Sequence, residues 1–306
     1  MTCGHPRVPH GQSILSVSQY GRTAVEDLFD VIDRKDWGDC TGKIIANLFY
    51  EPSTRTSSSF HAAMLKLGGN VIPINEVTYS SVSKGETLED TIRTLGCYVD
   101  AIVLRHPDDD AALVAHKVSS VPIVNAGCGS GEHPTQALLD LYTIYKENHT
   151  IDGLTVTLMG DLRYGRTVHS LVQLLGYFNV KIQFVSPPDL RIPGKYAKMG
   201  TIVELNDVLS TTDVLYLTRV QKERHTDHAS IFEPLEADYA AAPFSYGITE
   251  EHMASAKRGL TLMHPLPRLS EIPKEIDSDP RAAYFRQVRY GLDVRMALLS
   301  GILQED

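Results

Sequence analysis

The sequence predicts an α/β protein with two Rossmann-like domains, each built on a parallel sheet. Short apolar runs alternate with helical patterns along the whole chain, which is the pattern of α/β units. The length of 306 residues is sufficient for two domains of ordinary size. A strong helix pattern at 135–147 separates two alternating halves, and a second long helix pattern closes the chain. We therefore expect two α/β domains that are joined by a linking helix.

In the first half, apolar runs bounded by turn residues mark four strands. These are Lys43–Phe49, Val71–Ile74, Ala101–Leu104 and Pro122–Asn125. Apolar residues between Phe60 and Leu67 recur at i, i+3, i+4 and i+7, which is one face of a helix, and two glycines then end it. The segments 87–100 and 108–118 repeat the helical pattern.

The second half continues the alternation. Its predicted strands are 154–160, 180–187, 213–219 and 260–268, and its first helix is 165–178. The helix at 135–147 carries a continuous apolar stripe and is expected to connect the halves. The last segment, 279–303, reads as a helix that is broken near Gly291 and returns to the first domain.

Composition excludes several classes of protein. The net charge of −9 argues against a general nucleic-acid or membrane-surface binder, which needs a basic face. The four cysteines lie far apart without a CxxC pair, so neither a zinc site nor a disulfide framework is expected. No apolar run approaches the roughly 20 residues of a membrane span, and the start lacks the apolar segment of a signal peptide. A cytoplasmic protein with reduced thiols is expected.

The segment FYEPSTRTSSSF, residues 49–60, places hydroxyl groups and one arginine between a strand and a helix. A helix N-terminus offers backbone N–H groups and the positive end of the helix dipole, which together favour an anion. Ser53, Thr54 and Thr56 add donors, and Arg55, which looks buried from its context, can grip two phosphate oxygens. The competing interpretation is that Ser53 or Thr54 only caps the helix.

Other polar residues also follow predicted strands. Arg105, His133 and Gln136 do so in the first half, and Arg166, Arg219 and Gln221 in the second. A single residue of this kind more often has a structural role than a ligand-binding role. Ligands of open α/β sheets bind at the carboxyl ends of the strands, so these groups are expected to converge. The arginines outside the phosphate site suit a dicarboxylate ligand. The segment GDLRYG lacks the G-x-G-x-x-G spacing of a dinucleotide-binding loop, so a dinucleotide is not expected.

Five motifs then indicate a family. STRTS, HPTQ, GDLRYGRTVHS, TRVQKER and HPLPR, in this order, resemble the catalytic chains of the aspartate carbamoyltransferases, from about Gly11 to the C-terminus. The ornithine carbamoyltransferases share the phosphate motif but typically carry STRTR and HCLP. Here Ser57 and Pro265 stand at the two distinguishing positions, which favours aspartate.

The resemblance implies transfer of the carbamoyl group of carbamoyl phosphate to the α-amino group of L-aspartate, in pyrimidine biosynthesis. No metal or organic cofactor is implied. The carbamoyl-phosphate domain is expected at 1–134, completed by the helix 285–306, and the aspartate domain at 135–284. The family's chains are homotrimers with active sites shared between subunits. A separate free subunit and one domain of a larger polypeptide both fit the sequence.

The resemblance also implies a role for each matching residue. The expected catalytic residues are Arg55, Thr56, Lys84, Arg105 and His133. Carbamoyl phosphate is expected to bind Ser53, Thr54, Arg55, Thr56, Ser80, Lys84, Arg105, His133, Gln136, Pro265 and Leu266. Aspartate is expected to bind Lys84, Arg166, Arg219, Gln221, Leu266 and Pro267. Lys84 and a loop serine, Ser80 or Ser81, reach the neighbouring subunit's site, and all these cations are expected to face a cleft between the domains.

Two alternatives stay open. The chain could carbamoylate another amino acid such as ornithine, or it could be a catalytically silent scaffold homologue. Two departures from the family pattern are also present. Cys128 stands where an acidic residue is common, and residues 225–247 match the family's mobile loop only loosely.

Overall fold

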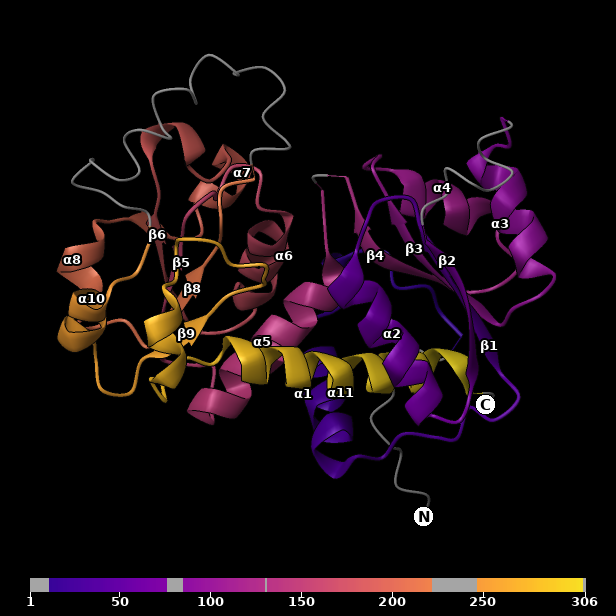
Figure 1. Cartoon of the computed structure of the whole chain (residues 1–306), viewed down its shortest axis with the longest axis horizontal. Helices are drawn as coiled ribbons and strands as arrows, with labels where there is room; N and C mark the ends of the chain where they lie inside the picture. The colour runs from indigo at the N-terminus through magenta and orange to yellow at the C-terminus, as the bar shows by residue number, and fades with distance from the viewer. Residues whose placement is uncertain (1–10, 76–84, 130, 222–246, 305–306) are drawn as a thin grey trace. The chain divides into compact units, whose positions relative to one another are not determined.

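The computed structural model describes residues 11–75, 85–129, 131–221 and 247–304 (Figure 1). It divides into two compact units, Met1–Tyr142 with Val288–Asp306, called unit 1 below, and Thr143–Gln287, called unit 2. Each unit contains one sheet in which every pair of neighbouring strands is parallel. The predicted α/β class with two parallel sheets is therefore confirmed. The substrate-based boundaries, 1–134 with 285–306 and 135–284, stay a prediction.

Unit 1 has a four-stranded sheet in the order β2-β1-β3-β4. Its strands are β1 (Ile44–Phe49), β2 (Asn70–Asn75), β3 (Ala101–His106) and β4 (Ile123–Cys128). Its helices are η1 (Val17–Gln19), α1 (Arg22–Arg34), α2 (Thr54–Lys66), α3 (Leu88–Gly96) and α4 (Ala111–Val118). All four strands contain the predicted runs or most of them, while α1 was not among the predicted helices.

Alternation along β1 explains how this sheet is covered. Ala46 and Leu48 belong to an apolar cluster that includes residues of α3 and α4. Asn47 points to the other face, where its Nδ2 donates a hydrogen bond of 3.1 Å to the carbonyl of Ser57 in α2. Successive side chains of a strand alternate between the faces of a sheet. The helices α3 and α4 therefore cover one face of this sheet, and α2 covers the other (Figure 1).

Unit 2 has a five-stranded sheet in the order β7-β6-β5-β8-β9. Its strands are β5 (Thr155–Met159), β6 (Lys181–Val185), β7 (Thr201–Ile202), β8 (Val214–Leu217) and β9 (Thr261–Met263). Its helices are α6 (Arg166–Leu175), η4 (Pro188–Leu190), α7 (Gly194–Ala197), α8 (Leu205–Val208), α10 (Glu250–Ser255) and η6 (Lys274–Ser278). The strand predicted at 260–268 was too long, because it ends before the prolines at 265 and 267, which lack the N–H of a ladder.

Two helices contain the points at which the chain passes from one unit to the other. They are α5 (Pro134–Asn148) and α11 (Tyr284–Leu303). The predicted break near Gly291 is wrong, since α11 is continuous. A Cβ atom on Gly291 would lie 3.0 Å from Leu139 Cδ2, so the glycine allows α11 and α5 to approach closely. Among the described residues, no helix is long and apolar enough to cross a membrane.

Candidate functional site

The carboxyl ends of β1 and β3, neighbouring strands of unit 1, bring three polar side chains together. Arg105 Nε donates to Glu51 Oε2 at 3.1 Å, and Arg105 Nη1 donates to Ser53 Oγ at 3.3 Å. Ser53 is the N-cap residue of α2, but its side chain makes no capping hydrogen bond. The hydroxyl therefore faces Arg105, and the interpretation of Ser53 as a capping side chain alone is wrong.

The first turn of α2 follows directly from this cluster. Thr54, Arg55 and Thr56 are its first three residues, and Thr56 is buried. Arg55 is exposed, so the expectation that it is buried was wrong; in the first turn its side chain lies on the solvent side of α2. Backbone N–H groups of a first helical turn lack partners within the helix and attract anions. This helix start, with Arg105 beside it, has the chemistry of an anion site.

His133 and Gln136 follow β4, the strand beside β3. His133 is buried, and its carbonyl accepts the N–H of Gln136 at 3.1 Å in the first turn of α5. Gln136 Nε2 donates to Asp140 Oδ1 at 2.8 Å. Because this bond fixes the nitrogen of the amide, Gln136 Oε1 is the atom turned away from Asp140, and an oxygen can only accept. Gln136 is therefore oriented to receive an N–H donor.

In unit 2, Asp161 connects the loops that follow β5 and β8. Its Oδ1 accepts the N–H of Tyr164 at 3.0 Å, and its Oδ2 accepts the N–H of Gln221 at 3.1 Å. Gln221 Nε2 also donates to the carbonyl of Tyr164 at 3.1 Å. Arg166 begins α6 two residues after Tyr164 and is 5% exposed. These bonds hold Arg166 and Gln221 at the same sheet edge.

Arg219 and the segment after β9 lie at that edge too. Arg219 follows β8, the neighbour of β9, and its Nη1 donates to the carbonyl of Val220 at 3.0 Å. His264 directly follows β9 and is buried; burial lowers its pKa below the ordinary value, and the nearby positive charge of Arg219 lowers it further. Leu266 has a left-handed backbone, with φ of 56°, and the Leu266-Pro267 bond is cis. Arg166, Arg219, Gln221 and Leu266 thus follow the ends of β5, β8 and β9, which are neighbours in the sheet.

Several predicted residues lie outside the described part of the chain. They are Ser80, Ser81, Lys84 and most of 225–247. Cys128 is the last residue of β4 and is buried in the apolar cluster of that face. Its side chain belongs to the core of unit 1.

Models of both halves of one family match the chain. The aspartate/ornithine carbamoyltransferase model of the carbamoyl-P binding domain covers residues 12–146, and that of the Asp/Orn binding domain covers 152–302. The chain belongs to this carbamoyltransferase family. The resemblance inferred from the five sequence motifs is confirmed.

Individual carbamoyltransferases match over nearly the whole chain. The aspartate carbamoyltransferase catalytic subunit of Thermoplasma acidophilum is 45% identical, across 95% of this chain and 98% of the relative. A crystal structure of aspartate transcarbamoylase from Trypanosoma cruzi in complex with carbamoyl phosphate has 42% identity and a TM-score of 0.88, covering 98% of this chain and 100% of that one. Another structure of that enzyme contains N-(phosphonacetyl)-L-aspartic acid.

A second group of carbamoyltransferase relatives consists of much longer proteins. The multifunctional protein pyr-3 of Neurospora crassa is 52% identical across 95% of this chain. The chain spans only 16% of its length, and 14% of the length of the multifunctional protein URA2 of Saccharomyces cerevisiae. Chains of this family therefore occur both as separate subunits and inside larger polypeptides.

Three residues that hydrogen-bond the predicted site residues were not predicted from the sequence: Glu51, Asp161 and His264. Glu51 is a lone carboxylate before a proline, and only the register of β1 and β3 places it beside Arg105. Asp161 stands inside the GDLRYG motif, and an acid directly after the predicted strand 154–160 is the signal that could have found it. His264 stood inside HPLPR, which was used only for its backbone.

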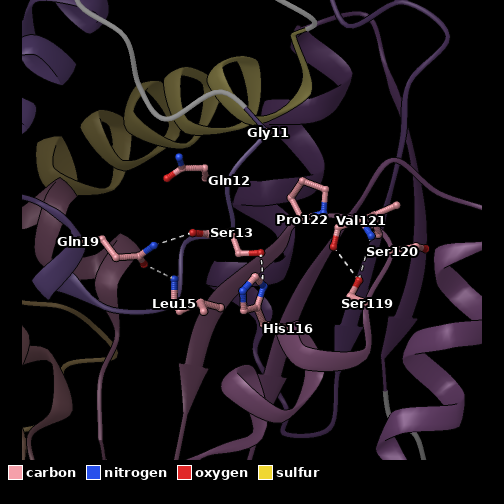
Figure 2. Close-up of a pocket in the computed structure, with 10 residues that line it drawn as sticks. All are labelled: Gly11, Gln12, Ser13, Leu15, Gln19, His116, Ser119, Ser120, Val121 and Pro122. Atoms are coloured by element: carbon pink, nitrogen blue, oxygen red, sulfur yellow. Dashed lines mark hydrogen bonds between the residues drawn. The ribbon is translucent and has the colours of Figure 1, made fainter.

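A pocket of about 390 Å³ in unit 1 is separate from the anion site (Figure 2). It is lined by the segments 11–19 and 116–122, which precede β4, so it lies at the amino ends of the strands. Ser13 Oγ accepts the N–H of Ile123 and lies 3.0 Å from His116 Nδ1. An anionic substrate needs cationic side chains around it, and the lining of this pocket has no Lys or Arg.

Proposed function

We propose that this chain transfers the carbamoyl group of carbamoyl phosphate to the α-amino group of L-aspartate, giving N-carbamoyl-L-aspartate and phosphate in pyrimidine biosynthesis. The observation that carries the proposal is the similarity over almost its whole length to aspartate carbamoyltransferase catalytic subunits. The hydrogen-bonded cluster of Arg105 and Ser53 at the start of α2 supports it, because that cluster suits a phosphate group.

Carbamoyl phosphate is assigned to the edge of unit 1. The phosphate group is held by Ser53, Thr54, Arg55 and Thr56. Arg105 bridges the phosphate and the carbonyl oxygen. Thr56, Arg105 and His133 polarise that carbonyl and stabilise the negative charge that develops on its oxygen, which is electrostatic preorganisation. Gln136 Oε1, left as an acceptor by the bond to Asp140, receives the carbamoyl amino group.

L-Aspartate is assigned to the edge of unit 2. Arg166, Arg219 and Gln221 hold its two carboxylates, since guanidinium groups bind carboxylates through two parallel hydrogen bonds. The backbone carbonyls of Pro265 and Leu266 accept from the carbamoyl amino group, and Leu266 and Pro267 border the aspartate. Asp161 does not touch the substrate and positions Gln221 through its backbone.

The reaction follows from these roles. The nitrogen of aspartate attacks the carbonyl carbon, a tetrahedral intermediate forms, and the bond from that carbon to the phosphate oxygen breaks. The departing phosphate accepts the proton of the amine, so no side chain is needed as a strong base. Acceleration then comes from holding two anions together and from neutralising their charge. No metal or organic cofactor takes part.

The proposed assembly is a homotrimer in which Lys84 and Ser80 of one chain complete the site of its neighbour. Mixing Lys84→Ala chains with Arg55→Ala chains tests it. Each variant alone is expected to be almost inactive, and the mixture should recover part of the activity because some sites receive both intact residues. Absence of recovery would refute the shared site. Cytoplasmic location and membership in a larger polypeptide stay predictions.

The activity itself is tested with purified chain, carbamoyl phosphate and one amino acid at a time. N-carbamoyl-L-aspartate is expected to form with aspartate, at a rate that far exceeds carbamoylation of ornithine. Ornithine has a positively charged side chain at neutral pH. Arg166 and Arg219 are also positively charged, so they disfavour it. Turnover of ornithine without turnover of aspartate would overturn the proposal.

A further inference from the structure

The turn after β9 is held by a histidine rather than by backbone bonds alone. The His264 side chain is 1% exposed, and its Nδ1 accepts the N–H of Leu266 at 2.8 Å. Its other ring nitrogen, Nε2, lies 2.9 Å from Glu271 Oε1. The His264 backbone N–H donates to Gln287 Oε1 at 3.0 Å. The imidazole therefore stands between the turn and the carboxylate of Glu271, whose side chain is 10% exposed.

These contacts fix the state of the ring. A backbone N–H can only donate, so Nδ1 of His264 must carry a lone pair, and Nε2 must carry the hydrogen that is donated to Glu271. Glu271 is itself anchored, because its Oε1 accepts the N–H of Leu269 at 3.0 Å and its carbonyl accepts the N–H of Ile248 at 2.9 Å. Glu271 thus selects the tautomer that can accept from Leu266.

Leu266 needs such a contact. Its φ of 56° lies in the left-handed region, which is unfavourable for a residue with a Cβ atom relative to the right-handed form. A side-chain acceptor two residues earlier in the chain stabilises a turn in the way that Asn and Asp do in Asx turns. The His264 ring supplies this acceptor from a buried, doubly anchored position.

We propose that His264 is a positioning residue for carbamoyl transfer. Its Nδ1 holds the Leu266 N–H, and thereby keeps the Leu266 carbonyl in the direction that accepts the carbamoyl amino group. His264 does not contact the reacting atoms. This inference rests on the proposed function, since it assigns the Leu266 carbonyl to the same substrate group.

Two substitutions test the roles of the two ring nitrogens of His264 separately. His264→Asn keeps an acceptor oxygen near the Nδ1 position and can form an Asx turn with Leu266. His264→Gln places its amide near the Nε2 position and leaves the Leu266 N–H without its acceptor. His264→Gln is expected to lower kcat by about 10- to 100-fold, the effect of misplacing a group by roughly 1 Å, with a smaller change in the KM for aspartate. His264→Asn is expected to stay within about threefold of the unaltered chain.

The kcat values are compared only for variants that circular dichroism shows to be folded at the assay temperature. Equal losses in both variants, equal retention in both, or a larger loss in His264→Asn would each overturn the proposal. A purely structural role would lower the unfolding temperature of both variants without this difference in kcat.

A spectroscopic test does not depend on activity. In the full chain labelled with ¹⁵N-histidine, the His264 signals, assigned by their loss in His264→Asn, should show an unprotonated Nδ1 and a protonated Nε2 at neutral pH. The reverse tautomer, or a doubly protonated ring, would refute the proposal. If the unaltered chain were inactive with every amino acid, the proposed function would fail, and this spectrum would still decide whether His264 holds Leu266.

Discussion

Arg295 is a buried cation in unit 1 that contacts α2 from α11. It is 4% exposed, its Nη1 donates to Ser59 Oγ at 3.0 Å, and its guanidinium lies 5.1 Å from the centre of the Phe60 ring. Burial lowers the pKa of Arg295 to about 10, and the negative charge of Asp140 on α5 opposes that shift. Arg295 is therefore charged at pH 7, and the negative charge of Asp140 favours that charged form.

Removal of this cation should destabilise unit 1 strongly. In Arg295→Met the apolar stem remains, but Asp140, which is 0% exposed, loses a favourable positive charge. Leaving a buried polar or charged group without its favourable partner costs about 1–3 kcal/mol. Removing both charges, in Arg295→Met with Asp140→Leu, should recover part of this loss, because the buried carboxylate that interacts with Arg295 is then removed as well.

The assay is urea unfolding followed by the fluorescence of Trp37, the single tryptophan of the chain. Trp37 lies in unit 1, next to Gly38, whose N–H donates to Ser300 Oγ on α11 at 2.8 Å. Arg289→Met on the same helix is the control, since that side chain is 61% exposed and should change the free energy of unfolding by less than about 1 kcal/mol. A loss below about 1 kcal/mol in Arg295→Met, or a double variant as unstable as the sum of the single ones, would refute the reasoning.

Three further predictions concern unit 2. Asp161→Asn should raise the KM for aspartate about tenfold or more, because one oxygen that accepts the N–H of Gln221 or Tyr164 becomes a donor; steady-state kinetics measures it. Gly160→Ala should lower the unfolding temperature sharply, because φ is 113° and a Cβ atom would lie 2.1 Å from the carbonyl oxygen of Thr218. Burial lowers the pKa of His169, so the unfolded chain binds its proton more tightly. The free energy of unfolding of unit 2 should therefore fall as the pH drops below about 6.5, as hydrogen exchange of α6 would show.

Each of these three predictions has an outcome that contradicts it. An unchanged KM for aspartate in Asp161→Asn would show that Gln221 is positioned by other contacts. Gly153→Ala is the control for Gly160→Ala, since Gly153 has φ of 84° but no atom within 4 Å of an added Cβ; equal effects would exclude the clash with Thr218 as the cause. A free energy of unfolding that rises on acidification would contradict the sign derived for His169.

The fold was largely predictable because most of its strands are continuous buried runs, although β2 is largely exposed. All six residues of β4 are buried, and four of the five in β5, so apolar runs bounded by turns were a reliable signal. Helix α1 carries an equally clear helical stripe in Val25, Leu28, Phe29 and Ile32, although it was not among the predicted helices. By contrast, β7 has only two residues, and both are exposed, so no period could reveal it.

Other features depend on tertiary contacts that a single sequence does not show. Glycine usually weakens a helix, and Gly291 was therefore predicted to break one. Its close approach to Leu139 outweighs that preference. The same limit applies to the site: motifs named Arg105 and Ser53, but the carboxylate that holds Arg105 comes from the register of β1 and β3. Which ring nitrogen of His264 accepts is likewise a property of the folded turn.

We assign the phosphate end of the reacting pair to the edge of unit 1 and the dicarboxylate end to the edge of unit 2. Calorimetric titration with N-(phosphonacetyl)-L-aspartic acid tests it, because this one molecule carries both ends. Binding is expected to be far tighter than that of phosphate. It should weaken by at least about 30-fold, or about 2 kcal/mol, in both Arg105→Gln and Arg166→Gln, but not in Arg93→Gln, whose side chain is 58% exposed. Binding no tighter than that of phosphate, or binding that is unchanged in Arg105→Gln or in Arg166→Gln, would contradict this assignment.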